Sequence, residues 1–240
     1  LNTMLEGIKP LLEDITGGKS LMAILSNYAV KSLVTSTCEV DPSLFSNDKA
    51  QASNIAKKIE MASKFSKMDI FRATTHNKGI FNGIDAVVIA TGNDWRAIEA
   101  GGHAYATKDG KYSGLTEWTF DEEKYILKGK LTLPMPVASV GGSIGLNPTV
   151  KTAFNILNNP DAKTLAGIIV SVGLAQNFAA LKALVSTGIQ KGHMKLQARS
   201  LALFAGAENE EVDIVVEKLL ETNRINSENA KNILKEIRNK

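Results

Sequence analysis

The chain has 240 residues, 44% of them hydrophobic, and its 28 basic and 25 acidic side chains leave a net charge of +3. This is enough material for one large core or two small ones, and the scattered, nearly balanced charges argue against a nucleic-acid-binding protein. The single cysteine, Cys38, excludes an internal disulfide and is expected to be a small strand residue.

The first third of the chain is predicted to hold helices around one strand. Apolar residues over 4–15 recur at helical spacing, and Pro10 is expected to kink the helix that they predict. A second short helix is expected over 20–30, and the alternation over 32–40 predicts a strand. Residues 47–66 return to helical spacing.

The next stretch, residues 71–97, combines many polar side chains with several glycines. It reads FRATTHNKGIFNGIDAVVIATGNDWRA and surrounds one short apolar segment with charged and amide side chains. Gly79, Gly83 and Gly92 let a backbone turn sharply and approach a ligand. We therefore expect a loop that carries a site, followed by a buried segment over 84–90, which periodicity alone assigns to neither strand nor helix.

The second half contains strands followed by helices. Strands are predicted over 115–120 and 124–133, and helices over 148–157 and 161–189, the latter with Asp161 as its N-cap. The longest apolar run lies in that last helix but is interrupted by glycine and serine, so no membrane association is expected. No cluster of histidine, cysteine and carboxylate has metal-ligand spacing, so no metal is expected either.

Residues 194–240 are predicted to form a small helical unit. Their charged fraction rises, an apolar helical stripe runs through 212–220, and Ser227 is expected to cap the last helix. Gly188 and Gly192 flank the junction before this unit, as a mobile lid would need. A fixed helical appendage is the alternative interpretation.

Lys78 and Asp94 are the charged pair on which a site in the polar stretch would depend. An ammonium group can stabilise negative charge that develops on a carbonyl oxygen, and a nearby carboxylate keeps the lysine charged and fixes its direction. The same residues would also serve a Schiff-base reaction at Lys78, so on their own they leave the carbonyl chemistry open.

Two motifs carry a resemblance to a known family, THNKG and GNDWRA. The two motifs stand at the family's spacing and resemble the catalytic lysine region of HMG-CoA (3-hydroxy-3-methylglutaryl-coenzyme A) reductases, specifically the soluble class II form. The resemblance extends through NTMLEGIKPLLEDITGGKS, PMPVASVGG and GLAQNFAALKALVSTGIQKGHM. It implies an oxidoreductase of the mevalonate pathway, which makes isoprenoid precursors, that reduces HMG-CoA to mevalonate and coenzyme A with two hydrides from NADH or NADPH. It also favours a helix over 84–90.

The resemblance implies catalytic roles for three residues. Lys78 matches the lysine that stabilises the oxyanion, and Asp94 matches the aspartate beside it. His193, in QKGH, matches the histidine that protonates the departing coenzyme A thiolate. His76 and His103 are expected to be structural.

The resemblance implies binding roles for five further residues. Arg72, six residues before the lysine, is expected to bind the substrate's free carboxylate, and Asn82 to hydrogen-bond the substrate or the lysine. Gln176 and Leu184 are expected to shape the substrate pocket, with plain core packing as the alternative for Leu184. Asn27 matches an asparagine near the cofactor and the substrate.

The implied fold is α+β. Residues 1–45 would complete a small cofactor-binding domain with an antiparallel sheet, and residues 46–193 would form much of a large catalytic domain with a long central helix. Residues 194–240 would be a C-terminal helical lid. Because the family forms dimers with active sites at the subunit interface, a cytoplasmic homodimer or higher oligomer is expected.

The resemblance also identifies parts of the enzyme that this chain would lack. The family needs a glutamate in an ENVIG-like motif, a DAMGAN loop and further coenzyme A contacts, and these motifs do not occur in the 240 residues. The chain is therefore expected to be a C-terminal portion that is active only with the N-terminal half. A catalytically silent fragment or homologue that supplies an oligomer interface is the alternative.

Overall fold

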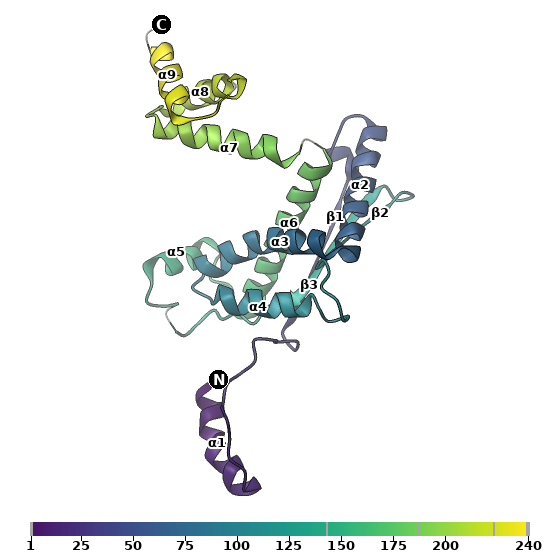
Figure 1. The fold of residues 1–240 in the computed structure, drawn as a ribbon, viewed down its shortest axis with the longest axis vertical. Coiled ribbons are helices and arrows are strands. Elements are labelled where there is room, and N and C mark those ends of the chain that lie inside the picture. Colours follow the sequence, from purple (N-terminus) through teal and green to yellow (C-terminus); the bar gives the residue numbers. More distant parts are fainter. Residues whose placement is uncertain (1, 143, 187, 223, 239–240) are drawn as a thin grey trace. The chain divides into compact units, whose positions relative to one another are not determined.

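The computed structural model describes residues 2–142, 144–186, 188–222 and 224–238, and of residues 189–193 the backbone only. The chain divides into two compact units, Leu1–Phe178 and Ala179–Lys240. In the first unit the elements are α1 Asn2–Thr16, β1 Leu33–Val40, the 3-10 turn η1 Pro42–Leu44, α2 Lys49–Met68, α3 Ile70–Ala90, α4 Trp95–Tyr105, β2 Thr116–Asp121, β3 Ile126–Pro134 and α5 Pro148–Ile156 (Figure 1). Helix α6, Ala162–Val185, continues into the second unit, where α7 Ile189–Phe204, α8 Asn209–Glu221 and α9 Ser227–Arg238 follow.

The described strands form one antiparallel sheet in the order β1-β3-β2. Strand β1 pairs with β3 from Leu33↔Pro134 to Val40↔Leu127, and β2 pairs with the other edge of β3. The alternation in β2 and β3 places Trp118, Leu131 and other apolar side chains on a buried face, which confirms the two predicted strands and an α+β fold.

Cys38 lies in β1, as the alternation predicted. Burial raises the pKa of its thiol, so the group stays protonated at neutral pH and has the character of a small apolar side chain.

Helix α6 is the long central helix that the sequence predicted, and it packs closely on α3. Two glycines permit the approach: a Cβ at Gly173 would lie 2.8 Å from Cγ1 of Ile84, and one at Gly83 would lie 2.9 Å from Cβ of Gln176. The side chain of Asp161 accepts a hydrogen bond from Thr164 N at 2.7 Å, which confirms the predicted cap.

By length and composition, α6 is also long and apolar enough to cross a membrane, with a mean hydropathy of 1.7 in its most apolar window. The residues that interrupt its apolar run are glycine and serine rather than charges, so they do not take the helix below this measure. Apolar side chains of α6 at Leu165, Ile169 and Leu174 lie buried in the protein core, as they do in the core helix of many globular proteins.

The predicted loop over the polar stretch was wrong: helix α3 runs unbroken from Ile70 to Ala90. Asp69 caps this helix by accepting a hydrogen bond from Arg72 N at 2.6 Å. The apolar residues Ile80, Ile84 and Val88 recur at helical spacing and are fully buried. The many polar residues concealed this stripe, because several of them lie on the exposed side of the same helix.

Two local predictions also failed, and one helix was not predicted. Residues 20–30 form no helix, since exposed side chains such as Leu21 and Met22 find no core to pack against and a short helix needs one. Helix α4 was not predicted, although Asp94 signals its start. The last helix is capped by Asn226, whose Oδ1 accepts from Asn229 N at 2.8 Å, and Ser227 is already its first residue.

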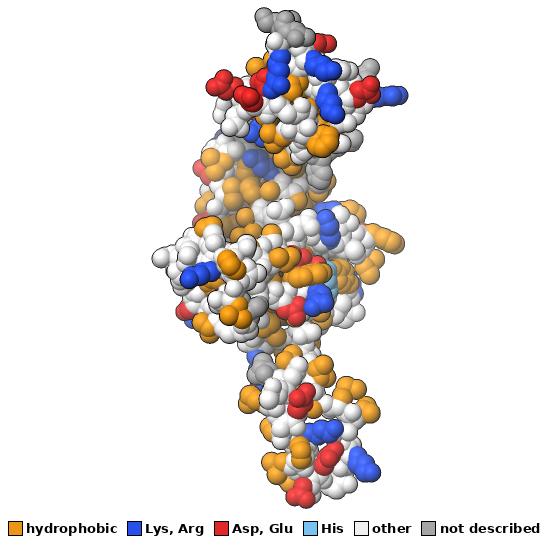
Figure 2. Space-filling view, turned by 90° about the vertical axis from the view of Figure 1, so that its left-hand side faces the viewer, with side chains coloured by type: hydrophobic (Ala, Val, Ile, Leu, Met, Phe, Trp, Pro, Cys, Tyr) orange, Lys and Arg blue, Asp and Glu red, His pale blue; other side chains and the backbone are white. Residues whose placement is uncertain are grey.

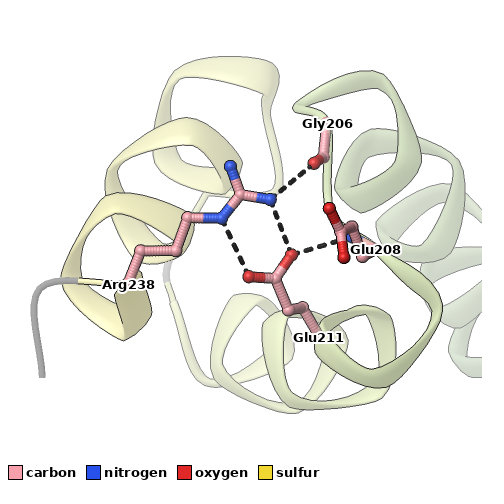
Figure 3. Close-up of polar contacts among 4 residues, drawn as sticks. All are labelled: Gly206, Glu208, Glu211 and Arg238. Carbon is pink, nitrogen blue, oxygen red and sulfur yellow. Dashed lines mark hydrogen bonds and ion pairs between the residues drawn. The ribbon is translucent and has the colours of Figure 1, made fainter.

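The second unit is built from α7, α8 and α9 around a core of alanine and aliphatic side chains, including Ala198, Val215 and Leu219. Arg238 joins α9 to the start of α8: its Nε and Nη2 each donate to the Glu211 carboxylate at 2.8 Å, and Nη2 donates to Gly206 O at 3.0 Å (Figure 3). A carboxylate oxygen of Glu211 also accepts from Glu208 N at 2.8 Å, which completes a capping box.

The apolar side chains of α1 lie in solvent (Figure 2). Met4 is 65% exposed and Ile15 is 69% exposed, and no residue of this helix is buried. The helix continues through Pro10 without a break.

The three domains predicted at 1–45, 46–193 and 194–240 do not coincide with these compact units. Strand β1 pairs along its whole length with β3, so residues on both sides of position 45 share one sheet. The division between the units falls inside α6. The assignment of these segments to cofactor, catalytic and lid functions stays a prediction.

Candidate active site

Lys78 and Asn82 lie on one exposed stripe of α3. They are four residues apart, so their side chains are neighbours on the same helix face. Both side chains are exposed, while the opposite side of the helix is buried. A polar substrate therefore has access to the ammonium and the amide together.

A network of buried polar groups holds the opposite side of α3. Asn77 donates to Ser113 O at 3.0 Å and accepts from Leu115 N at 2.9 Å, which fixes α3 against the segment that leads into β2. Because Asn77 directly precedes Lys78, these two bonds also fix the backbone on which the lysine side chain stands.

His76 extends this network to α6. Its Nε2 lies 2.5 Å from Oγ1 of Thr116 and 3.2 Å from Nδ2 of Asn177. Oδ1 of Asn177 accepts from Thr116 Oγ1 and from Trp118 Nε1, each at 2.9 Å. Burial, with the charges of Arg72 and Lys67, lowers the pKa of His76 to about 3. The imidazole is therefore neutral at physiological pH, which supports the structural role expected for His76.

His103 also has structural contacts in α4. Its ring lies against Phe81, with centroids 4.8 Å apart, and its Nδ1 lies 2.8 Å from the Tyr112 hydroxyl. These contacts support the expected structural role.

Asp94 is the N-cap of α4. Its carboxylate accepts hydrogen bonds from Arg96 N at 3.1 Å and from Ala97 N at 3.2 Å, and Nε of Arg96 lies 3.8 Å from Oδ1. Across the residues that the structure covers, no hydrogen bond or ion pair within 4 Å joins Asp94 to Lys78. The direct pairing expected between these two side chains is therefore not formed here.

Asn93 was not predicted, and it links Asp94 to the segment that follows β3. Its amide donates to Ala138 O at 3.1 Å and its Oδ1 accepts from Ala138 N at 2.8 Å, so it binds both backbone groups of one residue in PMPVASVGG. The preceding residue, Gly92, has φ of 68° and reverses the chain after α3. The sequence signal was available, since an asparagine between a turn glycine and a cap aspartate is well placed to bind backbone.

Arg72 is half-buried, and burial lowers the pKa of its guanidinium, which remains charged. Within the described ranges, no carboxylate lies within ion-pair distance of it. A partly desolvated guanidinium without a counter-ion is well suited to a bidentate contact with a ligand carboxylate.

The structure brings two further predicted residues near the helices of the site. Gln176 of α6 packs against Gly83, the neighbour of Asn82. The carbonyl of Asn27 lies so close to α4 that a Cβ at Gly101 would be 2.6 Å from its oxygen. Gly101 thus lets the segment before β1 lie against the helix that Asp94 starts.

Two predicted residues lie in the second unit. Leu184 is 43% exposed, so the alternative of plain core packing does not apply to it within that unit. The side chain of His193 falls outside the described residues. The described residues of both units contain no group of three or more histidine, cysteine or carboxylate side chains that could hold a metal ion.

The chain is similar to known proteins over nearly its whole length. The profile of the family described as hydroxymethylglutaryl-coenzyme A reductase matches residues 1–198. The 3-hydroxy-3-methylglutaryl-coenzyme A reductase of Archaeoglobus fulgidus is 44% identical over 238 residues, which are 99% of this chain and 53% of that protein. A probable reductase of Borreliella burgdorferi is 36% identical, over 99% of this chain and 56% of its own length.

Solved structures show the same likeness. The Streptococcus pneumoniae reductase superposes with a TM-score of 0.76 at 60% identity, over 99% of this chain and 56% of that one. The class II reductase of the same organism, solved with NADPH in open conformations, gives the same TM-score and identity over 57% of its chain. The chain thus spans about half the length of the relatives that it matches. With a family profile that covers most of its residues and relatives this similar, the chain belongs to the hydroxymethylglutaryl-coenzyme A reductase family.

Proposed function

We propose that this chain carries the carbonyl-activating part of an NAD(P)H-dependent HMG-CoA reductase. The observation that carries the proposal is the exposed Lys78–Asn82 stripe, supported from behind by the Asn77 hydrogen bonds, in a member of this family. The reaction converts a thioester into an alcohol, so negative charge develops on one carbonyl oxygen in each of two reduction steps.

Lys78 is assigned to that oxygen. A preorganised cationic donor aimed at a developing oxyanion is worth about 3–4 kcal/mol of barrier. Asp94 keeps the lysine charged and oriented, which requires the two side chains to come closer than they lie here. His193 supplies the proton that the departing coenzyme A thiolate takes up.

Arg72 and its neighbours are assigned to the substrate. The guanidinium of Arg72 binds the free carboxylate of HMG-CoA, Asn82 hydrogen-bonds the reacting group, and Gln176 and Leu184 border it. The nicotinamide cofactor, NADH or NADPH, supplies the hydrides. Among this chain's residues Asn27 is the one assigned to the cofactor, so most of its site must come from elsewhere.

The same proposal assigns the remaining half of the enzyme as a partner. Its support is twofold: the relatives are about twice as long, and the apolar face of α1 is uncovered. A cytoplasmic homodimer or higher oligomer completes the proposal, and the free Cys38 fits a reducing compartment. A catalytically silent protein that supplies an oligomer interface is the second candidate, which the same uncovered face favours.

The test combines the 240-residue chain with the part of the Streptococcus pneumoniae enzyme that it does not cover. We expect HMG-CoA-dependent oxidation of NADPH that requires both parts. Lys78→Ala should lower kcat by about 10²–10³-fold, the usual effect of removing one oxyanion donor. The matched control is Lys111→Ala, an exposed lysine outside the site, which should change nothing. A folded, assembled but inactive combination would favour the silent-interface candidate.

A further inference from the structure

Two carboxyl groups that have no place in the proposed mechanism lie between α3 and α4. Asp85 follows Lys78 by seven residues and Asn82 by three, so it continues the same stripe of α3. Glu99 lies on α4, five residues after Asp94. The pair therefore connects the helix that carries Lys78 to the helix that Asp94 starts.

The contact between these carboxyl groups requires a proton. The side chains of Asp85 and Glu99 lie within hydrogen-bonding reach of each other, and Oδ1 of Asp85 is buried with no donor directed at it. Two ionised carboxylates can only accept hydrogen bonds, so they would repel each other and leave this oxygen unsatisfied. A single proton on either group removes both penalties.

No cation in the described chain takes the place of that proton. The pKa of the Asp85 carboxyl responds to its own desolvation and to the Glu99 carboxyl, and no lysine or arginine contributes. The nearest cations along the two helices do not pair with these carboxyl groups. Lys78 lies two turns from Asp85 along α3, and Arg96 lies beside Asp94. Burial and the charge of Glu99 raise the pKa of Asp85 to about 7.

We propose that Asp85 and Glu99 share a proton and act as a positioning pair that holds α3 and α4 together, and with them Lys78 and Asp94. Loss of the proton adds one negative charge between the helices and forces them apart. The catalytic consequence depends on the proposed function, whereas the sharing of the proton does not.

The first experiment measures the protonation itself in the 240-residue chain. Carboxyl carbon NMR should show a group that titrates with a midpoint near pH 7 and disappears in Asp85→Asn. The control variant Glu123→Gln, at an exposed carboxylate outside the site, should leave this titration unchanged. A midpoint near the ordinary value of 3.8 would overturn the proposal.

The second experiment measures stability against pH. Because the folded-state pKa lies above the ordinary value of 3.8, the stabilisation should be complete below about pH 4 and lost as the pH rises through about 7. Asp85→Asn should remove this loss, since its amide donates to Glu99 at any pH, and Glu99→Gln should do the same. An unchanged pH dependence in both variants would contradict a shared proton.

The third experiment uses the combined enzyme. In the wild type, kcat should fall as the pH rises through about 7, with a smaller change in KM, and Asp85→Asn should keep its kcat into the alkaline range. The same alkaline fall in both proteins would refute the positioning role. If the wild type has no activity, the proposed function fails, and the first two experiments still decide whether the proton is shared.

Discussion

The two units of the chain each hold a helix in place with polar side chains, but in different surroundings. In the first unit, His76 and Asn177 join α3, β2 and α6 through buried, uncharged groups. In the second unit, Arg238 joins α9 to α8 through a charged pair at the surface. Buried neutral networks are costly to break but insensitive to salt, whereas exposed ion pairs are weak and screened.

The largest effect is expected from Asn177→Ala. Its Oδ1 accepts two hydrogen bonds, so the substitution leaves the buried donors of Thr116 and Trp118 without a partner. At about 1–3 kcal/mol for each unsatisfied group, the free energy of unfolding should fall by about 3 kcal/mol. Chemical denaturation measures this, with the exposed Asn155→Ala as the control. A loss no larger than in the control would mean that the network contributes little to stability.

An intermediate effect is expected from Gly173→Ala in α6. The new methyl would lie 2.8 Å from Cγ1 of Ile84, and overpacking of this kind costs about 1–3 kcal/mol. Gly167→Ala on the same helix meets open space and should instead stabilise the chain, by up to about 1 kcal/mol. Shifts of the melting temperature in opposite directions would sharpen the comparison. Ile84→Val, which removes the Cδ1 that would lie 2.9 Å from the new methyl, should partly rescue the first variant. Equal shifts would indicate that α3 and α6 do not pack closely.

The smallest effect is expected from Arg238→Ala in the second unit. Hydrogen bonds from Arg238 and from Glu208 N lower the pKa of Glu211 to about 2. A depressed carboxyl pKa stabilises the fold above its ordinary value of 4.5, and this contribution is lost as the pH falls toward about 2. The variant should be slightly less stable at pH 7, and its free energy of unfolding should depend less on acid pH and on salt concentration. A loss of unfolding free energy as large as that expected for Asn177→Ala in the first unit would break the distinction between the two anchors.

Periodicity predicted most of the elements that have one apolar face. Helices α1, α2, α5 and α6 and all three described strands were found close to their predicted positions. Helix α3 was missed over its first half because its exposed side is crowded with polar and glycine residues, although Ile80, Ile84 and Val88 mark its buried face. The short helix expected at 20–30 failed because the pattern gave apolar residues but could not say whether a core lay beside them.

Prediction from sequence has the same limit at the functional site. The resemblance predicted roles for Lys78, Asp94 and the binding residues, and the structure places the described ones on α3, at the start of α4, on α6 and, for Asn27, in the segment before β1. Partnerships were harder to predict, since they depend on contacts between distant segments. Asn93 binds a residue 45 positions away, and Asp85 faces a carboxyl on the next helix. No spacing in the sequence indicates either contact.

The contacts of Asn177 also bear on the order in which the chain can fold. Its partners His76 and Thr116 are 101 and 61 residues earlier, so they emerge from the ribosome long before α6 does. Until then the imidazole, the hydroxyl and the indole N–H that later share this amide must stay hydrated, which keeps the inner face of the sheet open. Long-range contacts of this kind close slowly. A nascent chain that stops short of residue 177 should therefore remain a target for chaperones and proteases, whatever helices it has already formed.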